Sequence, residues 1–163
     1  MAPQEQMPVS PSPGPSADPR APGPLADPPE DGPTATQGDI IELTVPALTT
    51  YLSVVRTATA GLAARLSFTF DEIEDLRIAV DEACAMLLPH AVEMAQLTCT
   101  FELSPETLDV TVTLPTTRGQ LPERDTFSWT VLTALAGEVD TGLDAERQVW
   151  IRLRKRRGAA GPA

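Results

Sequence analysis

The sequence predicts an α+β fold, a two-layer sandwich in which helices cover one face of a mixed or antiparallel sheet. Three observations predict it. Some segments alternate apolar and polar residues, which is typical of strands buried on one face. Other segments carry apolar residues at helical spacing. The predicted helices are grouped in the order β-α-α-β-β-α-β instead of alternating one-to-one with strands, which favours helices layered on one side of the sheet.

Composition divides the chain into three parts. Residues 1–38 hold eleven of the 17 prolines and offer little apolar surface, so the entropic cost of ordering them is not met and we expect a disordered tail. Residues 39–157 contain all the periodic segments and form the predicted domain. Residues 158–163 are expected to be a short flexible C-terminus.

The first predicted strand covers residues 41–45 and ends at Pro46. The first predicted helix covers residues 51–66. Its apolar stripe consists of Leu52, Val55, Thr59, Leu62 and Leu66. Arg56 does not belong to this stripe, so its side chain is expected to be free to pair with a carboxylate.

The second predicted helix covers residues 71–88 and is stopped or kinked by Pro89. Thr69, followed three residues later by Glu72, fits a capping box at its start. The predicted buried face consists of Ile73, Leu76, Val80, Ala83 and Leu87.

A hairpin and a third helix complete the predicted sheet and helix layer. Residues 97–101 and 108–114 alternate as two strands joined by a short turn, which predicts an antiparallel hairpin. A loop over 115–124 leads to a third helix capped by Asp125 or Thr126. Its predicted apolar face consists of Phe127, Val131, Leu135 and Val139. Gly142 is expected in the next turn, and Val149, Ile151 and Leu153 alternate in the last strand.

Charge and composition restrict the function classes. The formal net charge of −11 predicts a soluble chain that nucleic acid would repel and that suits a basic protein partner. The basic run 152–157 is expected to complement acidic groups of the same protein or dimer, with nucleic-acid binding as the alternative. No segment is long and apolar enough for a membrane span and the N-terminus lacks signal-peptide character, so we expect a cytoplasmic protein.

Cysteine and histidine, which often act in catalysis or metal binding, are scarce in this sequence. Cys84 and Cys99 lie in apolar contexts and are expected to be small buried residues, with a disulfide or redox pair as the alternative. His90 is the only histidine, so a metal site is not expected; we interpret it as a helix-end side chain bonding local carbonyls.

The second helix carries the most specific motif in the chain. Glu82-Ala83 is followed in register by His90-Ala91. This motif resembles the pattern E-A-x-x-N-A-x-x-H-A in the ATP-binding helix of the GHKL superfamily, the histidine-kinase-like ATPases, and is most similar to the RsbW-type anti-sigma factor kinases. The predicted element order also fits that fold. The resemblance implies that Glu82 stands at the position of the general base.

Three positions depart from the pattern of the resembled family. Met86 replaces the asparagine that holds Mg²⁺, and a soft thioether cannot substitute for a hard oxygen ligand. Pro115 stands in a segment that lacks the family's Asp-x-Gly-x-Gly motif. Trp129, with Phe127, stands where a glycine-rich helix entry would cradle phosphate, and we expect both rings to fill that space. We therefore expect no ATP binding, no cofactor and no enzyme activity, with Glu82 retained as a structural or partner-binding carboxylate.

The resemblance implies an anti-sigma factor that sequesters an RNA polymerase sigma factor, forms a homodimer and is released by a regulatory protein partner. The first-helix arginine of the family, which contacts sigma, matches Arg56 here. Leu52, Val55 and Thr59 are candidates for the dimer interface or for the core. Two alternatives stay open: an active serine kinase that phosphorylates a STAS-domain antagonist, and a pseudo-ATPase interaction module unrelated to sigma.

Overall fold

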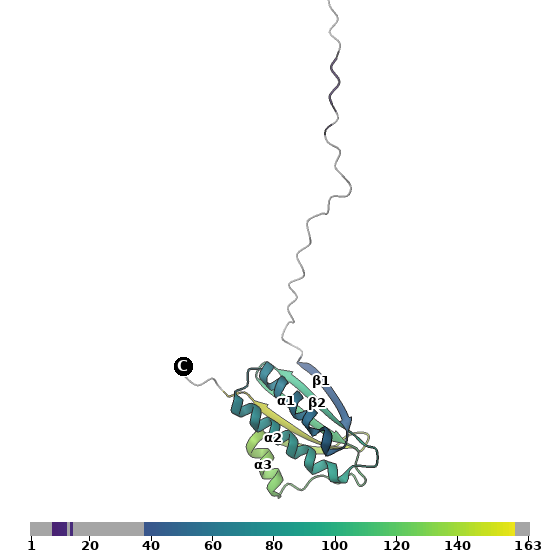
Figure 1. The fold of residues 1–163 in the computed structure, drawn as a ribbon, viewed down its shortest axis with the longest axis vertical. Coiled ribbons are helices and arrows are strands. Elements are labelled where there is room, and N and C mark those ends of the chain that lie inside the picture. Colours follow the sequence, from purple (N-terminus) through teal and green to yellow (C-terminus); the bar gives the residue numbers. More distant parts are fainter. Residues whose placement is uncertain (1–7, 13, 15–37, 159–163) are drawn as a thin grey trace, which may run out of the picture. The chain divides into compact units, whose positions relative to one another are not determined.

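The computed structural model describes residues 8–12, 14 and 38–158. The predicted disordered tail over 1–38 and the predicted flexible end over 158–163 lie almost entirely outside the described residues, so both stay predictions. Residues 38–158 form the α+β domain (Figure 1).

The described domain contains five strands and three α-helices. The strands are β1 (Asp39–Pro46), β2 (Gln96–Ser104), β3 (Thr107–Leu114), β4 (Glu138–Leu143) and β5 (Val149–Arg156). The helices are α1 (Leu52–Arg65), α2 (Phe70–Leu87) and α3 (Phe127–Ala136), with one-turn 3-10 helices η1 (Thr49–Tyr51) and η2 (Leu88–His90).

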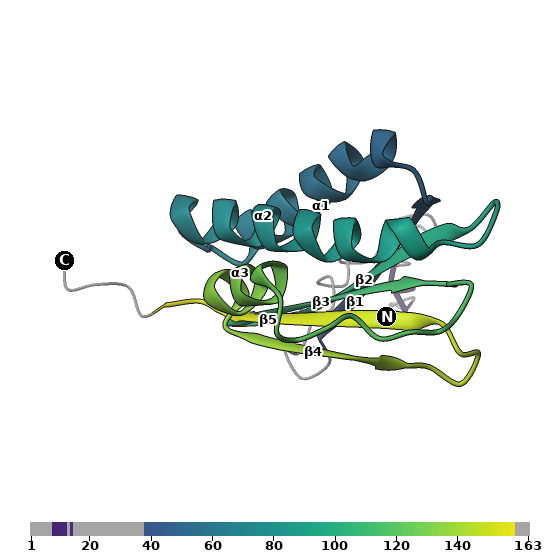
Figure 2. The ribbon, with the colours of Figure 1, turned by 90° about the horizontal axis from the view of Figure 1, so that it is seen from below.

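The strands form one sheet in the order β1-β2-β3-β5-β4, and every neighbouring pair is antiparallel. All three helices lie on the same face of this sheet (Figure 2). The predicted two-layer α+β sandwich is therefore confirmed, and of the two sheet types expected the antiparallel one is present.

The prediction missed strand β4 and misplaced the buried face of α3. Gly137, with a φ of 93°, ends α3, and the chain then turns back as β4, which contains Val139 and Gly142. Val139 therefore belongs to a strand and Gly142 does not lie in a turn. The buried residues of α3 are Trp129, Leu132 and Ala136, whereas Phe127 is 83% exposed.

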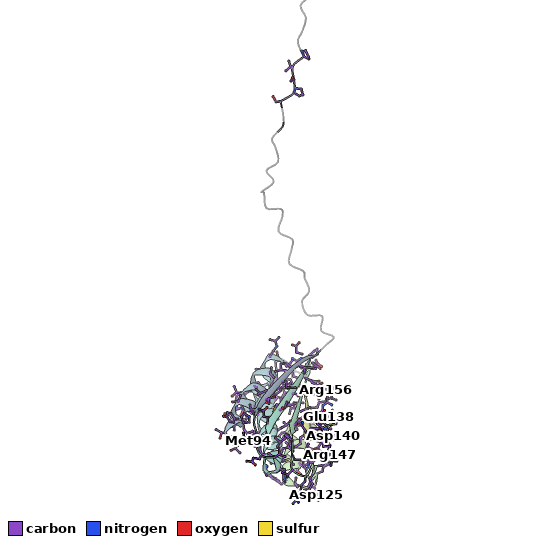
Figure 3. All side chains as sticks on the ribbon, turned by 90° about the vertical axis from the view of Figure 1, so that its right-hand side faces the viewer. Met94, Asp125, Glu138, Asp140, Arg147 and Arg156 are labelled. Atoms are coloured by element: carbon purple, nitrogen blue, oxygen red, sulfur yellow. The ribbon has the colours of Figure 1, made fainter. Side chains whose placement is uncertain are left out.

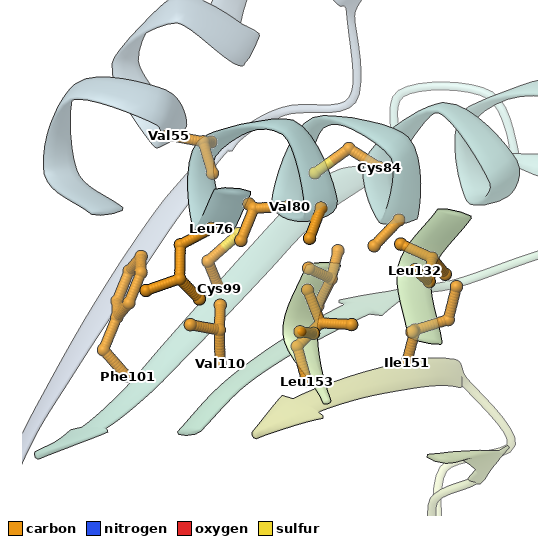
Figure 4. Packing of buried hydrophobic residues seen from close by; sticks show 14 of the residues in the cluster. Val55, Leu76, Val80, Cys84, Cys99, Phe101, Val110, Leu132, Ile151 and Leu153 are labelled. Carbon is orange, nitrogen blue, oxygen red and sulfur yellow. The ribbon is translucent and has the colours of Figure 1, made fainter. Parts of the chain in front are cut away.

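The core lies between the helix layer and the inner face of the sheet. Phe101, Val110 and Leu153 pair across β2, β3 and β5 in one row, and all three are fully buried. Leu76 and Val80 of α2 pack over this row (Figure 4). The alternation of apolar and polar residues along each central strand thus directs one set of side chains into the core.

Cys84 of α2 and Cys99 of β2 are both free and fully buried in this core. The prediction of small buried apolar residues is confirmed. The hydrogen bond between their thiols, and burial, raise the pKa of the Cys84 thiol far above its ordinary value. Because the thiolate is the reactive form of cysteine, this thiol is held unreactive.

A capping box fixes the start of α2, as the sequence predicts. The Thr69 hydroxyl accepts the N–H of Glu72, and the Glu72 carboxylate accepts the N–H of Thr69 at 2.7 Å. Burial would raise the pKa of Glu72, but hydrogen bonds from Gly158 and Thr69 and the charge of Lys155 together lower it below its ordinary value. The ionised carboxylate thus stabilises the folded domain.

Lys155 at the end of β5 and Gly158 just after it form hydrogen bonds with the helix layer. Lys155 Nζ donates to the carbonyl of Leu135 at 2.6 Å and lies 3.3 Å from Asp75 Oδ2. The N–H of Gly158 donates to Glu72 Oε1 at 2.6 Å. These groups complement acids and carbonyls of the same chain, as expected for the run 152–157.

The outer face of the sheet is polar, and one carboxylate on it is buried. Asp109 is 6% exposed. Its Oδ1 accepts from Arg154 Nε at 2.8 Å and lies 3.4 Å from Arg152 Nε. Glu138 and Asp140 of β4 lie on the same side of the domain (Figure 3). Such a face is what an antiparallel sheet shows when it packs on helices through one side only.

Candidate functional site

The candidate site is a pocket of about 390 Å³ at the end of α2. This volume lies in the range of small-molecule sites. Its wall comes from the end of α2 and the following 3-10 helix, from the segment between β3 and α3, and from the first turn of α3. The lining residues are Met86, Leu87, His90, Thr116, Gln120, Leu121, Pro122, Glu123, Thr126 and Ser128.

The motif helix supplies one wall of the pocket. Met86 is half-buried and Leu87 is buried, and both line the pocket. His90 also lines it, and among the described residues its side chain forms none of the hydrogen bonds with local carbonyls that the sequence suggested. Glu82 is half-buried one turn before Met86 and is not among the lining residues. The structure therefore brings Met86 and His90 together at the site and leaves Glu82 beside it.

The start of α3 supplies the opposite wall. Thr126 is the N-cap, and its hydroxyl accepts the N–H of Trp129 at 3.2 Å, so the predicted cap is confirmed. Thr126 and Ser128 both line the pocket. The first-turn N–H groups of a helix carry partial positive charge, so this wall favours a negatively charged or hydrogen-bond-accepting group.

Trp129 and Phe127, which the sequence suggested would fill a phosphate site, do not fill this pocket. Trp129 is 7% exposed and packs into the core, and Phe127 points into solvent with 83% of its surface exposed. Neither residue lines the pocket, and neither does Pro115. At helical spacing of about 100° per residue, the small side chain of Ser128 faces the pocket while its two aromatic neighbours face elsewhere.

The side chains that line the pocket differ in whether they can coordinate Mg²⁺. Met86 does not fit Mg²⁺, which prefers hard oxygen ligands. Oxygen donors are present on the facing wall, where Glu123, Thr126 and Ser128 line the pocket. A protein-bound Mg²⁺ in this pocket would therefore take Glu123 as its carboxylate ligand instead of a group from α2.

Arg56, the predicted sigma contact, lies on the outer surface of α1. Its side chain is 41% exposed, and its Nη1 is 3.4 Å from Asp81 Oδ2 of α2. The expectation that Arg56 is free is therefore wrong, because a carboxylate of its own chain already pairs with it. The ion pair leaves part of the guanidinium open to solvent.

The structure decides between the two roles left open for the apolar residues of α1. Leu52, Val55 and Thr59 are 9%, 1% and 0% exposed. The hydroxyl of Thr59 donates to the carbonyl of Val55 at 2.8 Å. All three are core residues, so a partner contact by these side chains is excluded by their burial within their own domain.

The chain is similar in sequence to named protein kinases, although no model of a known protein family matches it. It is 39% identical over 92 residues to serine-protein kinase RsbW of Halalkalibacterium halodurans, a match that covers 56% of this chain and 55% of that protein. It is 49% identical over 53 residues to serine-protein kinase RsbW of Bacillus subtilis, covering 32% of this chain and 33% of that one. The matches thus span about half or less of the length of these relatives.

A solved structure shares the fold. It contains the RsbU and RsbW domains of a Mycobacterium tuberculosis protein and superposes with a TM-score of 0.59 at 15% identity, covering 75% of this chain and 33% of that chain. Within the described residues no helix is long and apolar enough to cross a membrane.

These matches overturn one expectation and confirm another. The prediction that the chain is not an enzyme is contradicted, since the relatives carry the name of a protein kinase. The predicted resemblance is confirmed by both the sequence relatives and the shared fold. The chain is thus similar to serine-protein kinases RsbW over about half of its length or less, and it shares the fold of a solved structure that contains an RsbW domain.

Proposed function

We propose that this chain is an anti-sigma factor that binds and sequesters an RNA polymerase sigma factor, and that a regulatory protein releases it. The observation that carries the proposal is the 39% identity to RsbW over 92 residues. The resemblance of the motif helix to RsbW-type anti-sigma kinases is what implies sigma capture.

The surface around Arg56 supports this proposal. Arg56 and Asp81 join the outer sides of α1 and α2 in a half-exposed ion pair. The exposed apolar residues Val54 of α1 and Ile78 of α2, 45% and 51% exposed, belong to the same two helices. A surface that combines partly exposed apolar groups with an arginine suits a protein partner, since arginine can form paired hydrogen bonds with a carboxylate.

The sigma proposal is tested by co-expression with each sigma factor of the source organism and size-exclusion chromatography. One sigma factor should co-elute with the wild-type chain. The variant Arg56→Gln should weaken the complex by about tenfold or more, the loss typical of a charged contact at an interface. Arg65→Gln is the matched control, because Arg65 is exposed at the last turn of the same helix. Failure of every sigma factor to co-elute would refute the proposal.

A second proposed activity is protein serine kinase. The names of the relatives support it, and so does the pocket, which the aromatic residues leave open. Bound Mg²⁺ would neutralise the charge of the nucleotide phosphates. Thr126 and Ser128 at the start of α3 line the pocket and could position the nucleotide, and Glu123 offers a carboxylate.

The kinase proposal is tested with labelled ATP and a STAS-domain protein from the same organism. Incorporation of phosphate into a serine of that protein is the expected result. Glu123→Gln should lower the rate and Glu93→Gln should not, because Glu93 is exposed in the turn before β2 and does not line the pocket. Absence of both nucleotide binding and phosphate transfer would refute this second activity without affecting the test of sigma capture.

A further inference from the structure

One wall of the pocket is formed by a segment that is attached to the rest of the domain at both ends. We define residues 116–124 as the strap. At its beginning, Thr116 forms a β-bridge with Ala91, and the N–H of Thr117 donates to the carbonyl of His90 at 3.1 Å. The N–H of Gly119 then donates to the Thr116 hydroxyl at 3.0 Å. This end of the strap is therefore fixed to the segment that follows α2.

The middle of the strap forms pocket wall with little support of its own. Gln120, Leu121, Pro122 and Glu123 line the pocket. Among the described residues no hydrogen bond joins residues 120–122 to another part of the chain. Leu121 is 47% exposed, so burial contributes little to its position. The position of this wall therefore depends on how the far end of the strap is held.

At the far end of the strap, the Thr126 hydroxyl donates to the carbonyl of Glu123 at 3.2 Å. The side chain of Arg124 supplies the contacts with β4 and with the ring of Trp129. Its Nη2 lies 2.7 Å from Asp140 Oδ1 of β4. Its guanidinium carbon lies 5.0 Å from the ring centroid of Trp129, a cation–π distance. Trp129 is buried in α3, and so the strap is joined through one side chain to both a helix and an edge strand.

Asp140 is itself fixed for this contact. Its Oδ1 accepts the N–H of Thr141 at 2.9 Å as well as Arg124. The hydrogen bond from Thr141 and then that from Arg124 lower the pKa of Asp140, so the carboxylate stays charged at neutral pH. The acceptor for Arg124 is thus oriented before the arginine reaches it.

We propose that Arg124 is a positioning residue of the pocket, which keeps the strap closed by stacking on Trp129 and pairing with Asp140. Arg124 does not line the pocket itself and acts through its neighbour Glu123 and through residues 120–122. When this contact is lost, the strap opens from its second half while Thr116 and Thr117 stay attached. This role of Arg124 does not depend on which ligand or partner the pocket binds.

The experiment measures access to the pocket beneath the strap. Met86→Cys places a thiol on the pocket wall, and its reaction rate with a small cationic methanethiosulfonate reagent reports strap opening. The two native cysteines are 0% exposed, so the chain without Met86→Cys gives the background rate. Adding Arg124→Gln should raise the rate about fivefold, the size expected for losing one exposed ion pair and one cation–π contact.

Matched variants separate positioning from a general loss of stability. Arg118→Gln removes the same charge from an exposed residue of the same strap and should leave the rate unchanged. Arg124→Lys keeps the charge but loses the planar stacking group, and Asp140→Asn keeps the stacking but loses the ion pair, so both should give intermediate rates. Hydrogen exchange in α3 should stay unchanged in Arg124→Gln, because the helix itself is not loosened.

The salt dependence of the labelling rate distinguishes a role of the Arg124 charge from a purely structural role. Ions screen exposed charge pairs, so raising the ionic strength should increase the labelling rate of the chain that keeps Arg124 more than that of Arg124→Gln. Equal labelling rates of folded Met86→Cys protein with and without Arg124→Gln would overturn the proposal. So would hydrogen exchange that increases throughout α3 in Arg124→Gln.

Discussion

Replacing Asp109 by asparagine should lower the free energy of unfolding by about 2 kcal/mol. The change keeps the volume of the side chain and removes the charge that Arg152 and Arg154 share. Asp109 Oδ1 lies 2.8 Å from Arg154 Nε and 3.4 Å from Arg152 Nε, and the aspartate side chain is 8% exposed. The hydrogen bond with Asp109 raises the pKa of Arg154, which indicates that the contact favours the charged arginine.

The expected loss of stability is estimated from two limiting cases, a fully buried ion pair and a hydrogen bond to a charged group. Removing one partner of a fully buried ion pair costs about 3–5 kcal/mol, while hydrogen bonds to charged groups contribute about 1.5–3 kcal/mol. The two arginine side chains are 40% and 41% exposed, so water partly solvates them after the change. The lower range therefore applies.

Urea denaturation followed by circular dichroism measures this difference. Glu138→Gln is the matched control, since Glu138 is 72% exposed and its Oε2 lies 3.8 Å from Arg154 Nη1. This exposed pair should contribute less than about 0.5 kcal/mol. Equal effects of the two substitutions, or an effect of Asp109→Asn below about 0.5 kcal/mol, would refute the view that burial makes this carboxylate structurally important.

Five further substitutions, one of them a control, test other parts of the fold. Leu132→Ala should cost about 2–5 kcal/mol because the side chain is 0% exposed, whereas Val131→Ala, on the predicted but half-buried face, should cost less than about 1 kcal/mol in urea denaturation. Gly142→Ala should destabilise by about 1–3 kcal/mol and shift tryptophan emission, since an added Cβ would lie 2.6 Å from Trp150 Cζ2. Thr69→Ala should cost about 1 kcal/mol through loss of the capping box, measured by thermal denaturation. Glu72→Gln should flatten the acid side of the stability curve: the lowered pKa stabilises the fold above the ordinary glutamate pKa of about 4.3, and this contribution is lost as pH falls through the folded-state pKa.

Each of these substitutions has a result that would count against it. Similar losses of unfolding free energy for Val131→Ala and Leu132→Ala would support the buried face of α3 that the sequence predicted. Gly61→Ala is the control for Gly142, since an added Cβ there meets nothing within 4 Å, and both glycines giving stabilisation would contradict the close contact with Trp150. Thr69→Ala with unchanged thermal stability would mean that the capping box contributes nothing. A stability curve with the same acid slope for Glu72→Gln and wild type would remove the argument for an ionised capping residue.

The sequence predicted the strongly periodic elements correctly because one physical signal dominated each. The strand 97–101 alternates strictly, and β2 buries that apolar set. Thr69 and Glu72 are spaced as a capping box, and the structure contains both hydrogen bonds. In such segments local preference and tertiary packing agree, so the pattern suffices.

The region around α3 was mispredicted because its pattern supports more than one interpretation. Apolar residues occur on several sides of this helix, and the spacing of Phe127, Val131, Leu135 and Val139 continues past its true end. Gly137 directly after Ala136 was the available signal for a helix stop. Strand β4 is short, and Gly142 inside it resembles a turn until Trp150 is seen packed against it.

The pocket lies beside the motif helix that the sequence singled out, but most of its lining residues were not predicted. Met86 of the motif helix lines the pocket, but the sequence could not show which residues of α3 face it. One residue along a helix turns the side chain by about 100°, and this decides that Ser128 lines the pocket while Trp129 enters the core. Gln120, Leu121 and Glu123 were missed because loop residues carry no periodic signal.

The hydrogen bond between Gly158 and Glu72 holds residue 158 at the start of α2, whereas the pocket lies at the other end of this helix. Glu72, which holds Gly158, and Met86, on the pocket wall, are separated along α2 by about 21 Å at a rise of 1.5 Å per residue. A fluorescent label placed at position 158 would therefore stand clear of the pocket. Energy transfer from such a label to a coloured ligand would then report occupancy over a distance that the helix itself sets.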